Sequence, residues 1–253
     1  CSLAAKFGHL EVLKWLRLNG SKLDAEICSE AAAEGQWVVV QWAIENGCPC
    51  DYIVCFEAVK QRRFDMLKWA REHNCPWDET EFARAVANGD LEFMTWMKEN
   101  GCPYKNTRVC SEAAKWGQLE SLKWLREKDC PWDDTVYLEA ARAGDVEILK
   151  WAQENGCPRD EYRDQEPIAA AQHGHLEVLK WLKANGGVFS VDTFTAAAQV
   201  NRYAVLEYLR EIGCPFDEST TAAAALAGLP HIANWLVAIG CPISKASLEF
   251  VDM

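Results

Sequence analysis

Positively charged residues are scarce in this chain of 253 residues, because 26 Lys and Arg face 38 Asp and Glu and the formal net charge is −12. A protein that binds nucleic acid through its phosphates needs clustered cations that displace counterions. Docking on anionic lipid depends on similar clusters. The composition therefore predicts neither a nucleic-acid partner nor a membrane partner.

Long apolar runs and catalytic motifs are also missing. No run approaches the roughly 18 apolar residues that a membrane helix needs. The sequence contains no GxSxG, P-loop, HExxH or Rossmann glycine fingerprint. Only five His are present, and a glycine turn explains His173-Gly174-His175 better than a metal pair does. We therefore predict no enzyme activity, no cofactor, no metal and no small-molecule substrate.

The start of the chain lacks an initiator Met, a basic segment and the apolar core of a signal peptide. We expect the chain to be a fragment of a longer protein. Its first residues already fit the interior of a repeat, and we expect further repeats or a packed partner to cover the exposed ends of the array.

Tryptophan and cysteine are abundant, with twelve of each, and the tryptophans are periodic. Successive positions are separated by 27, 27, 27, 28, 27, 30, 27 and 27 residues. The residues in this series are Trp15, Trp42, Trp69, Trp96, Trp124, Trp151, Trp181, Tyr208 and Trp235. The chain therefore consists of about nine repeats of about 27 residues.

Each repeat is predicted to form two short helices. In the sixth repeat, Asp133 to Thr135 offer side-chain oxygens that cap a first helix, and Gly144 ends it. The second helix runs from Val146 past Trp151 and has a wide apolar face. One such pair cannot bury its apolar surface alone, whereas stacked pairs form a continuous core. We expect the Trp of one repeat to fill the space above the small Ala pair of the next.

The block Ala170-Ala171-Gln172-His173-Gly174-His175-Leu176-Glu177-Val178-Leu179, like the Gly8-His9-Leu10 region, resembles the ankyrin repeat. The resemblance covers the whole chain, although ankyrin repeats have 33 residues and these have about 27. The shortfall lies where the projecting hairpin tip would be. The resemblance implies an all-α solenoid of stacked helix-turn-helix repeats with truncated hairpin loops, spanning residues 1–253 as one array. A tetratricopeptide-type array is the alternative, but the Gly-His and Gly-Cys-Pro marks fit it poorly.

The cysteines occur mainly at two positions of the repeat. Seven precede Pro after the second helix, and four others lie in the first helix. Equivalent cysteines of adjacent repeats should lie roughly 10 Å apart, whereas a disulfide needs Cα atoms within about 7 Å. We therefore expect reduced, structural thiols and an intracellular, reducing compartment, the cytoplasm or nucleus. Cys48-Pro49-Cys50 is a close pair, but no second pair completes a zinc site.

Partner-binding residues follow from the resemblance, which implies that the two residues after the Ala pair point into the concave face. The candidates are Phe7, Glu34, Lys60, Gln61, Asn88, Lys115, Trp116, Arg142, Gln172, His173 and Gln199. Among them, an exposed Trp116 beside Lys115 and Arg142 would give an aromatic spot with a basic rim. Variation at these positions is also compatible with drift on a solvated face.

Acidic residues precede many first helices and would favour a partner with a basic surface. They are Asp51, Asp78, Glu79, Asp133, Asp134, Asp160, Glu161, Asp164, Glu166, Asp217 and Glu218. Residues 159–167 also contain a three-residue insertion, which is either functional or a tolerated surface change.

The predicted function is a non-catalytic scaffold that binds a protein partner on its concave face. The alternatives are a structural subunit of a larger assembly and the substrate-recognition arm of a ubiquitin-ligase-type adaptor.

Overall fold

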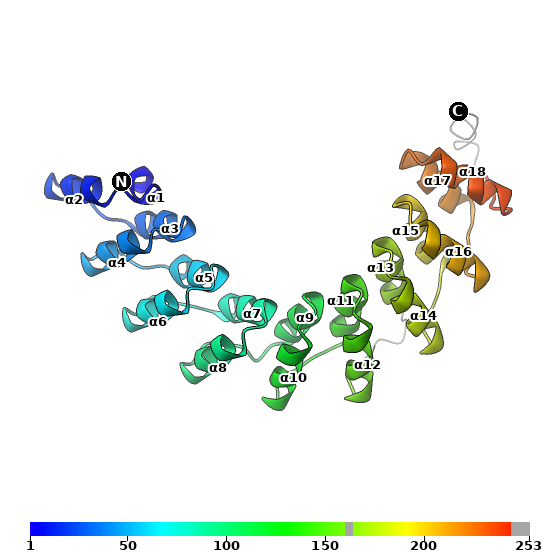
Figure 1. Cartoon of the computed structure of the whole chain (residues 1–253), viewed down its shortest axis with the longest axis horizontal. Coiled ribbons are helices and arrows are strands. Elements are labelled where there is room, and N and C mark those ends of the chain that lie inside the picture. Colours follow the sequence, from blue (N-terminus) through cyan, green and yellow to red (C-terminus); the bar gives the residue numbers. More distant parts are fainter. Residues whose placement is uncertain (160–163, 244–253) are drawn as a thin grey trace. The chain divides into compact units, whose positions relative to one another are not determined.

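The computed structural model describes residues 1–159 and 164–243, and these residues form eighteen α-helices and no strand (Figure 1). The first helices of the repeats carry odd numbers: α1 (Ser2–Lys6), α3 (Ala25–Ala33), α5 (Tyr52–Lys60), α7 (Glu79–Asn88), α9 (Thr107–Lys115), α11 (Thr135–Ala143), α13 (Gln165–His173), α15 (Val191–Gln199) and α17 (Glu218–Leu226). The second helices carry even numbers: α2 (Leu10–Leu18), α4 (Trp37–Glu45), α6 (Phe64–Glu72), α8 (Leu91–Glu99), α10 (Leu119–Glu127), α12 (Val146–Glu154), α14 (Leu176–Ala184), α16 (Tyr203–Glu211) and α18 (Pro230–Ala238).

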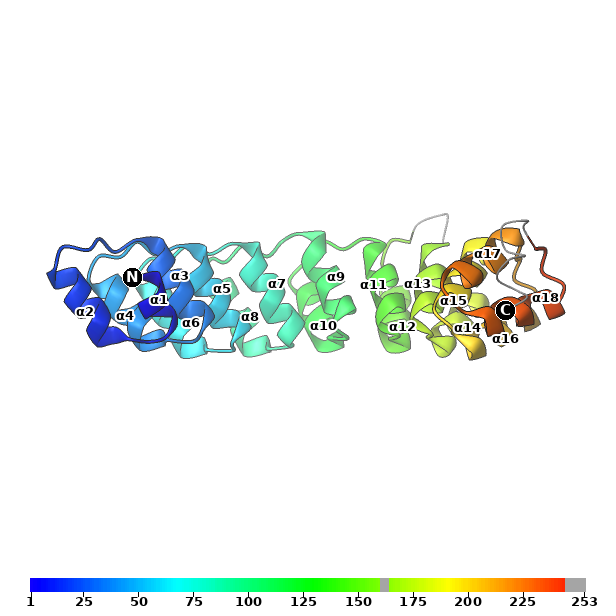
Figure 2. The same cartoon turned by 90° about the horizontal axis from the view of Figure 1, so that it is seen from above.

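The chain divides into an N-terminal unit, Cys1–Lys105, and a C-terminal unit, Asn106–Met253, and each is described by itself. Within each unit the odd-numbered helices pack against one another and form a first-helix row, while the even-numbered helices form a second-helix row (Figure 1). In the N-terminal unit, the loops that join successive repeats follow one edge (Figure 2). This architecture confirms the predicted all-α solenoid of helix pairs joined by short loops. That the nine repeats act as one array stays a prediction.

Local sequence accounts for where the helices begin and end. The carboxylate of Asp145 accepts a hydrogen bond from the Ile148 amide at the start of α12, and Asp51 accepts one from Ile53 at the start of α5. These caps satisfy amides that lack a partner within the helix. At the end of α11, Gly144 adopts φ +82°, a left-handed conformation that suits glycine.

The core lies where the first helices stack. The Ala pairs of the inner repeats are buried, and Ala31, Ala32, Ala113 and Ala114 are completely so. Small side chains let neighbouring first helices approach closely, and the apolar faces of the second helices complete the core through residues such as Leu67. No described helix is long and apolar enough to cross a membrane.

The periodic tryptophans pack differently from our expectation. Trp15 is 62% exposed and the others are half-buried. Trp69 stacks on His73 of its own repeat, whereas Trp96 and Trp235 contact rings of the preceding repeat. Trp96 lies 5.4 Å from Phe64 and 5.8 Å from Trp77, measured between ring centroids. Trp235 lies 5.4 Å from Tyr203. The reason is steric, because the tightly stacked first helices leave no space for an indole, whereas the second helices and loops do.

Candidate functional site

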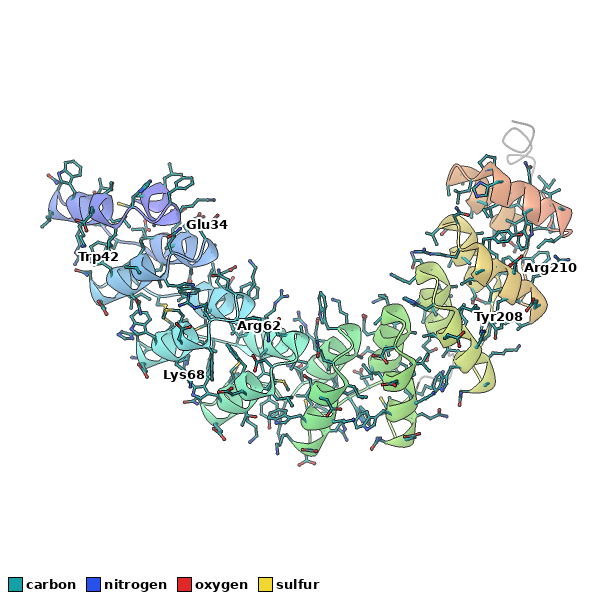
Figure 3. All side chains as sticks on the ribbon, in the orientation of Figure 1. Glu34, Trp42, Arg62, Lys68, Tyr208 and Arg210 are labelled. Carbon is teal, nitrogen blue, oxygen red and sulfur yellow. A yellow bond between two sulfur atoms is a disulfide. The ribbon has the colours of Figure 1, made fainter. Side chains whose placement is uncertain are left out.

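The predicted partner-binding residues lie at the C-terminal ends of the first helices or directly after them. Nine of the eleven are exposed and share the surface of the first-helix row in their own unit. These nine are Phe7, Glu34, Lys60, Lys115, Trp116, Arg142, Gln172, His173 and Gln199. In the N-terminal unit, Figure 3 shows Glu34 on the first-helix side and Trp42 on the second-helix side.

Gln61 and Asn88 are half-buried and serve the array itself. The Gln61 amide nitrogen donates to the carbonyl oxygen of Ala32 at 2.7 Å, in the preceding repeat. The Asn88 amide nitrogen donates to the carbonyl of Val59 at 3.3 Å in the same way. Each side chain therefore adds a second hydrogen bond to a carbonyl at the end of a first helix, because Ala32 already accepts from the Gly35 amide and Val59 from the Arg62 amide.

In the seventh and eighth repeats the residue before the second helix makes a related contact with the preceding repeat, whereas Asp90 and Asp145 at this position cap their own helices. In the seventh repeat, His175 Nε2 lies 3.0 Å from the carbonyl oxygen of Arg142. Its ring also covers Gly144, where an added Cβ would lie 2.6 Å from His175 Nδ1. Burial lowers the pKa of His175, which favours the neutral ring.

The two histidines around Gly174 each lie within reach of a backbone oxygen. His173 Nδ1 is 2.9 Å from the carbonyl of Ala169, and His175 contacts Arg142 as described. The part of the chain that the structure describes contains no group of three or more potential metal ligands. The contacts therefore support a structural role for this pair.

Trp116 is the most distinctive aromatic residue of the C-terminal unit's first-helix row. Its side chain is 51% exposed, and its indole nitrogen donates to Glu112 at 3.0 Å. The Lys115 ammonium lies 5.8 Å from the ring centroid, within cation–π range. Arg142, in contrast, forms an ion pair with Glu139 within its own helix. The aromatic spot therefore has Lys115 on its rim and is held in place by Glu112.

Charged residues dominate the first-helix row of the N-terminal unit. Lys6 lies 3.5 Å from Glu30 and 3.6 Å from Glu34, so it links two repeats. Lys60 lies 2.9 Å from Glu57 within α5. The Lys6 pairs are exposed and contribute little to stability, so their charges remain accessible to a partner. Glu57 is buried, and Lys60 is the accessible member of its pair.

A groove whose lining includes one charged residue, Asp192, lies between α15 and α17 in the C-terminal unit, and sequence reasoning did not single it out. It has a volume of about 610 Å³ and is bordered by Leu226, which is 81% exposed. The other lining residues are Asp192, Thr195, Gln199, Ser219, Ala222, Ala223 and Ala227. The sequence does contain a signal for this groove. The positions of Glu112 and Lys115 in the fifth repeat are occupied by Ala196 and Gln199 in the eighth repeat and by Ala223 and Leu226 in the ninth, so the charged pair is lost.

Four of the described acidic residues before the first helices act as caps: Asp51, Asp78, Asp133 and Asp217. Asp78 accepts from the Thr80 amide at 2.7 Å, and Asp217 accepts from the Ser219 amide at 2.8 Å. Glu166 is only 6% exposed and pairs with Arg159 at 3.2 Å, so the expectation that it belongs to an acidic surface is wrong. Asp160 and Glu161, with the rest of residues 160–163 of the predicted insertion, lie outside the described residues.

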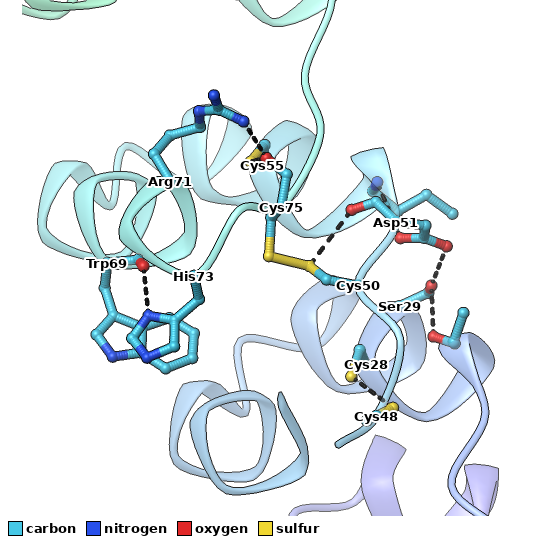
Figure 4. Close-up of a disulfide and its surroundings, with 12 residues drawn as sticks. Cys28, Ser29, Cys48, Cys50, Asp51, Cys55, Trp69, Arg71, His73 and Cys75 are labelled. Carbon is cyan, nitrogen blue, oxygen red and sulfur yellow. Dashed lines mark hydrogen bonds between the residues drawn. A yellow bond between two sulfur atoms is a disulfide. The ribbon is translucent and has the colours of Figure 1, made fainter. Parts of the chain in front are cut away.

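The expectation of reduced thiols throughout is wrong for Cys50 and Cys75, which form a disulfide with a Cα–Cα distance of 5.3 Å (Figure 4). The prediction compared equivalent cysteines, but Cys50 lies two residues after Cys48 and thus closer to the next repeat. The bridge joins the loop after α4 to the loop after α6. It removes the argument by which the sequence indicated a reducing compartment.

The structure is similar to the ankyrin repeat domain of human ASB11, with a TM-score of 0.54 and 18% sequence identity. The match covers 67% of this chain and 87% of that domain. No protein-family model and no curated protein matches the sequence. The likeness shows an ankyrin-like repeat fold, which agrees with the resemblance of the sequence motifs.

Proposed function

We propose that the chain is a non-catalytic scaffold that binds a protein partner through the exposed surface of its first-helix row. Ankyrin-like repeats form a protein-interaction fold, and fold alone does not assign a partner. The proposal therefore rests on what this surface presents.

The observation that supports the proposal is that Trp116, the residue directly after α9, exposes 51% of its side chain. A side chain of this size buries a large apolar area when a partner covers it, and Trp is enriched among residues that dominate binding energy. The hydrogen bond from Trp116 to Glu112 orients the ring before binding, which reduces the entropy lost on association.

The adjacent charges suggest how a partner would be selected. Glu112 and Lys115 flank the ring, and Glu139 with Arg142 repeats the same charge pattern one repeat further on. A partner with complementary polar groups around an apolar residue would fit this surface. A basic surface on the partner stays a prediction from the net charge of −12.

The test compares Trp116→Ala with Val38→Ala, which truncates a 66% exposed side chain on the second-helix row. Partners retained by the wild-type chain are identified by affinity purification and mass spectrometry, purified, and titrated by calorimetry. We expect Trp116→Ala to weaken binding about tenfold or more, equivalent to roughly 1.4 kcal/mol, and Val38→Ala to change nothing. Equal affinities for the wild type and Trp116→Ala, with unchanged circular dichroism, would refute the proposed surface.

A further inference from the structure

Five cysteines lie close together in the second and third repeats of the N-terminal unit (Figure 4). Cys28 is in α3 and Cys55 in α5, while Cys48, Cys50 and Cys75 are in the loops that follow α4 and α6. The disulfide between Cys50 and Cys75 connects these two repeats. The other cysteines supply thiols beside that bridge.

Cys28 and Cys48 form a thiol pair within the second repeat. Their sulfur atoms are 2.9 Å apart, and both side chains are at least 95% buried. Only Pro49 separates Cys48 from Cys50 in the chain. The thiol pair and the disulfide thus share the loop after α4, where Cys48 and Cys50 are two residues apart.

The hydrogen bond between the two thiols makes them chemically unequal. The Cys28 thiol donates to Cys48, which lowers the pKa of Cys48 and raises the pKa of Cys28. The Cys48 thiol in turn donates to the carbonyl of Asp24 at 2.9 Å, a hydrogen bond that it gives up when it ionises. The thiolate is the attacking species in thiol–disulfide exchange. Cys48 is thus the nucleophile of the pair, and Cys28 retains its proton until a later step.

We propose that the Cys50–Cys75 disulfide exchanges with the Cys28–Cys48 thiol pair, so that one bridge lies either between two repeats or within the second repeat. The Cys48 thiolate attacks Cys50 Sγ, the bond to Cys75 breaks, and Cys75 leaves as a thiolate. Cys28, after losing its proton, attacks Cys48 Sγ and releases Cys50 as a thiolate. The two protons lost by Cys28 and Cys48 end on Cys50 and Cys75, so no external oxidant or reductant is consumed.

The two positions of the bridge have different mechanical consequences. In the first, the loop after α4 is covalently tied to the loop after α6. In the second, Cys28 and Cys48 tie α3 to its own loop, and the second and third repeats are held only by non-covalent contacts, which include the hydrogen bond from Gln61 to Ala32. The exchange would therefore release one boundary of the N-terminal unit, independently of the partner-binding role.

The fifth repeat provides a matched internal control. Cys110 and Cys130 occupy the positions of Cys28 and Cys48, and a hydrogen bond with Cys130 raises the pKa of Cys110. However, Trp132 stands where the second repeat has Cys50. This pair therefore has no adjacent disulfide with which to exchange.

The experiment uses the full chain, purified without reductant and incubated anaerobically with a chelator but with no added thiol or disulfide. Samples are quenched in acid, alkylated with N-ethylmaleimide in urea, digested, and mapped by mass spectrometry. We expect linked Cys28–Cys48 peptides to appear at the expense of linked Cys50–Cys75 peptides, faster as the pH is raised. Their yield should exceed that of linked Cys110–Cys130 peptides by about tenfold or more.

A variant tests the order of the steps. Cys28→Thr introduces the residue found at the equivalent position of the ninth repeat, Thr221, which donates to Cys241 at 3.0 Å and is fully buried there. Without Cys28 the Cys48–Cys50 intermediate has no thiol to resolve it and reverts when Cys75 attacks Cys50, so we expect this variant to keep the Cys50–Cys75 bridge. Absence of the Cys50–Cys75 bridge in the purified chain would overturn the proposal. So would Cys28–Cys48 linkage no higher than Cys110–Cys130 linkage, or loss of the original bridge at the same rate in Cys28→Thr.

Discussion

Two buried glutamates at the same repeat position, one in each unit, are stabilised in different ways. Glu81 in α7 is completely buried, and Glu166 in α13 is 6% exposed. Glu166 pairs with Arg159, whose guanidinium also lies 5.6 Å from the Trp181 ring and donates to the carbonyl of Asn185 at 3.2 Å. The acidic group of the C-terminal unit is therefore buried with its own cation.

Glu81 has no such cation among its contacts. It accepts a hydrogen bond from the Asp78 amide at 2.6 Å as part of a capping box. Burial raises its pKa to about 7. In the other repeats this position holds a buried aliphatic residue or threonine: Ile27, Val54, Val109, Val136, Thr193 and Thr220. The comparison shows that a repeat frame tolerates a buried carboxyl group either through a cation or through protonation.

The largest effect is expected from removing the cation of the C-terminal unit. Arg159→Met should lower the free energy of unfolding by about 3–5 kcal/mol, because it leaves Glu166 buried without its charge partner. Urea unfolding followed by circular dichroism measures this change. Adding Glu166→Val, the residue type at position 136, should recover most of the loss.

An exposed ion pair serves as the control for that prediction. Lys180 and Glu177 are 2.7 Å apart, but Glu177 is 76% exposed. Lys180→Met should leave the urea midpoint unchanged. A similarly small effect for Arg159→Met would show that the buried pair is not stabilising.

Glu81 should make stability depend on pH. Its pKa in the folded state, about 7, lies above the ordinary value of 4.5, so the folded chain binds a proton that the unfolded chain has released. Stability should therefore decrease as the pH rises towards 7, by roughly 1.4 kcal/mol per pH unit, and level off above it. Urea unfolding between about pH 5.5 and 8.5 measures this slope. Glu81→Gln should flatten it, and an unchanged slope in that variant would assign the effect to other groups.

The smallest effect is expected from glycine substitutions at one backbone position of the repeat, compared between the two units. The glycine that ends the first helix in most repeats is replaced by Arg62 in the N-terminal unit and by Asn201 in the C-terminal unit, and both adopt φ +57°. Arg62→Gly should stabilise the chain by about 0.5–1 kcal/mol, because arginine is strained in this conformation. Asn201→Gly should gain less, since asparagine tolerates it and contacts His231 at 3.1 Å. Thermal unfolding of both variants measures the difference, and an equal gain at both positions would contradict this reasoning.

The period of the tryptophans and the Gly and Pro punctuation were sufficient to predict the helix pairs and their order. These signals are local, because caps, turns and apolar faces depend on residues a few positions apart. Trp116 and most of the predicted binding residues are exposed as expected, because their position after the Ala pair determines which way they face.

The features that sequence reasoning missed depend on contacts between neighbouring repeats. Cys50 meets Cys75 because a two-residue displacement along the loop brings it to the next repeat. Gln61 faces the carbonyl of Ala32 although its repeat position predicted a partner-facing side chain. Arg159 and Glu166 are seven residues apart, and only the fold places both in the interior. Period and composition do not determine such pairings.

The contacts at the ends of the first helices have an evolutionary consequence. Gln61, Asn88, His175 and Arg202 each reach a main-chain oxygen of the repeat before them. The acceptor is thus present whatever side chain the earlier repeat carries. A repeat that is duplicated, deleted or transplanted carries its own hydrogen-bond donor, and the repeat before it always offers a main-chain acceptor. Recombination can therefore reorder the exposed residues while the hydrogen bonds between neighbouring repeats are kept.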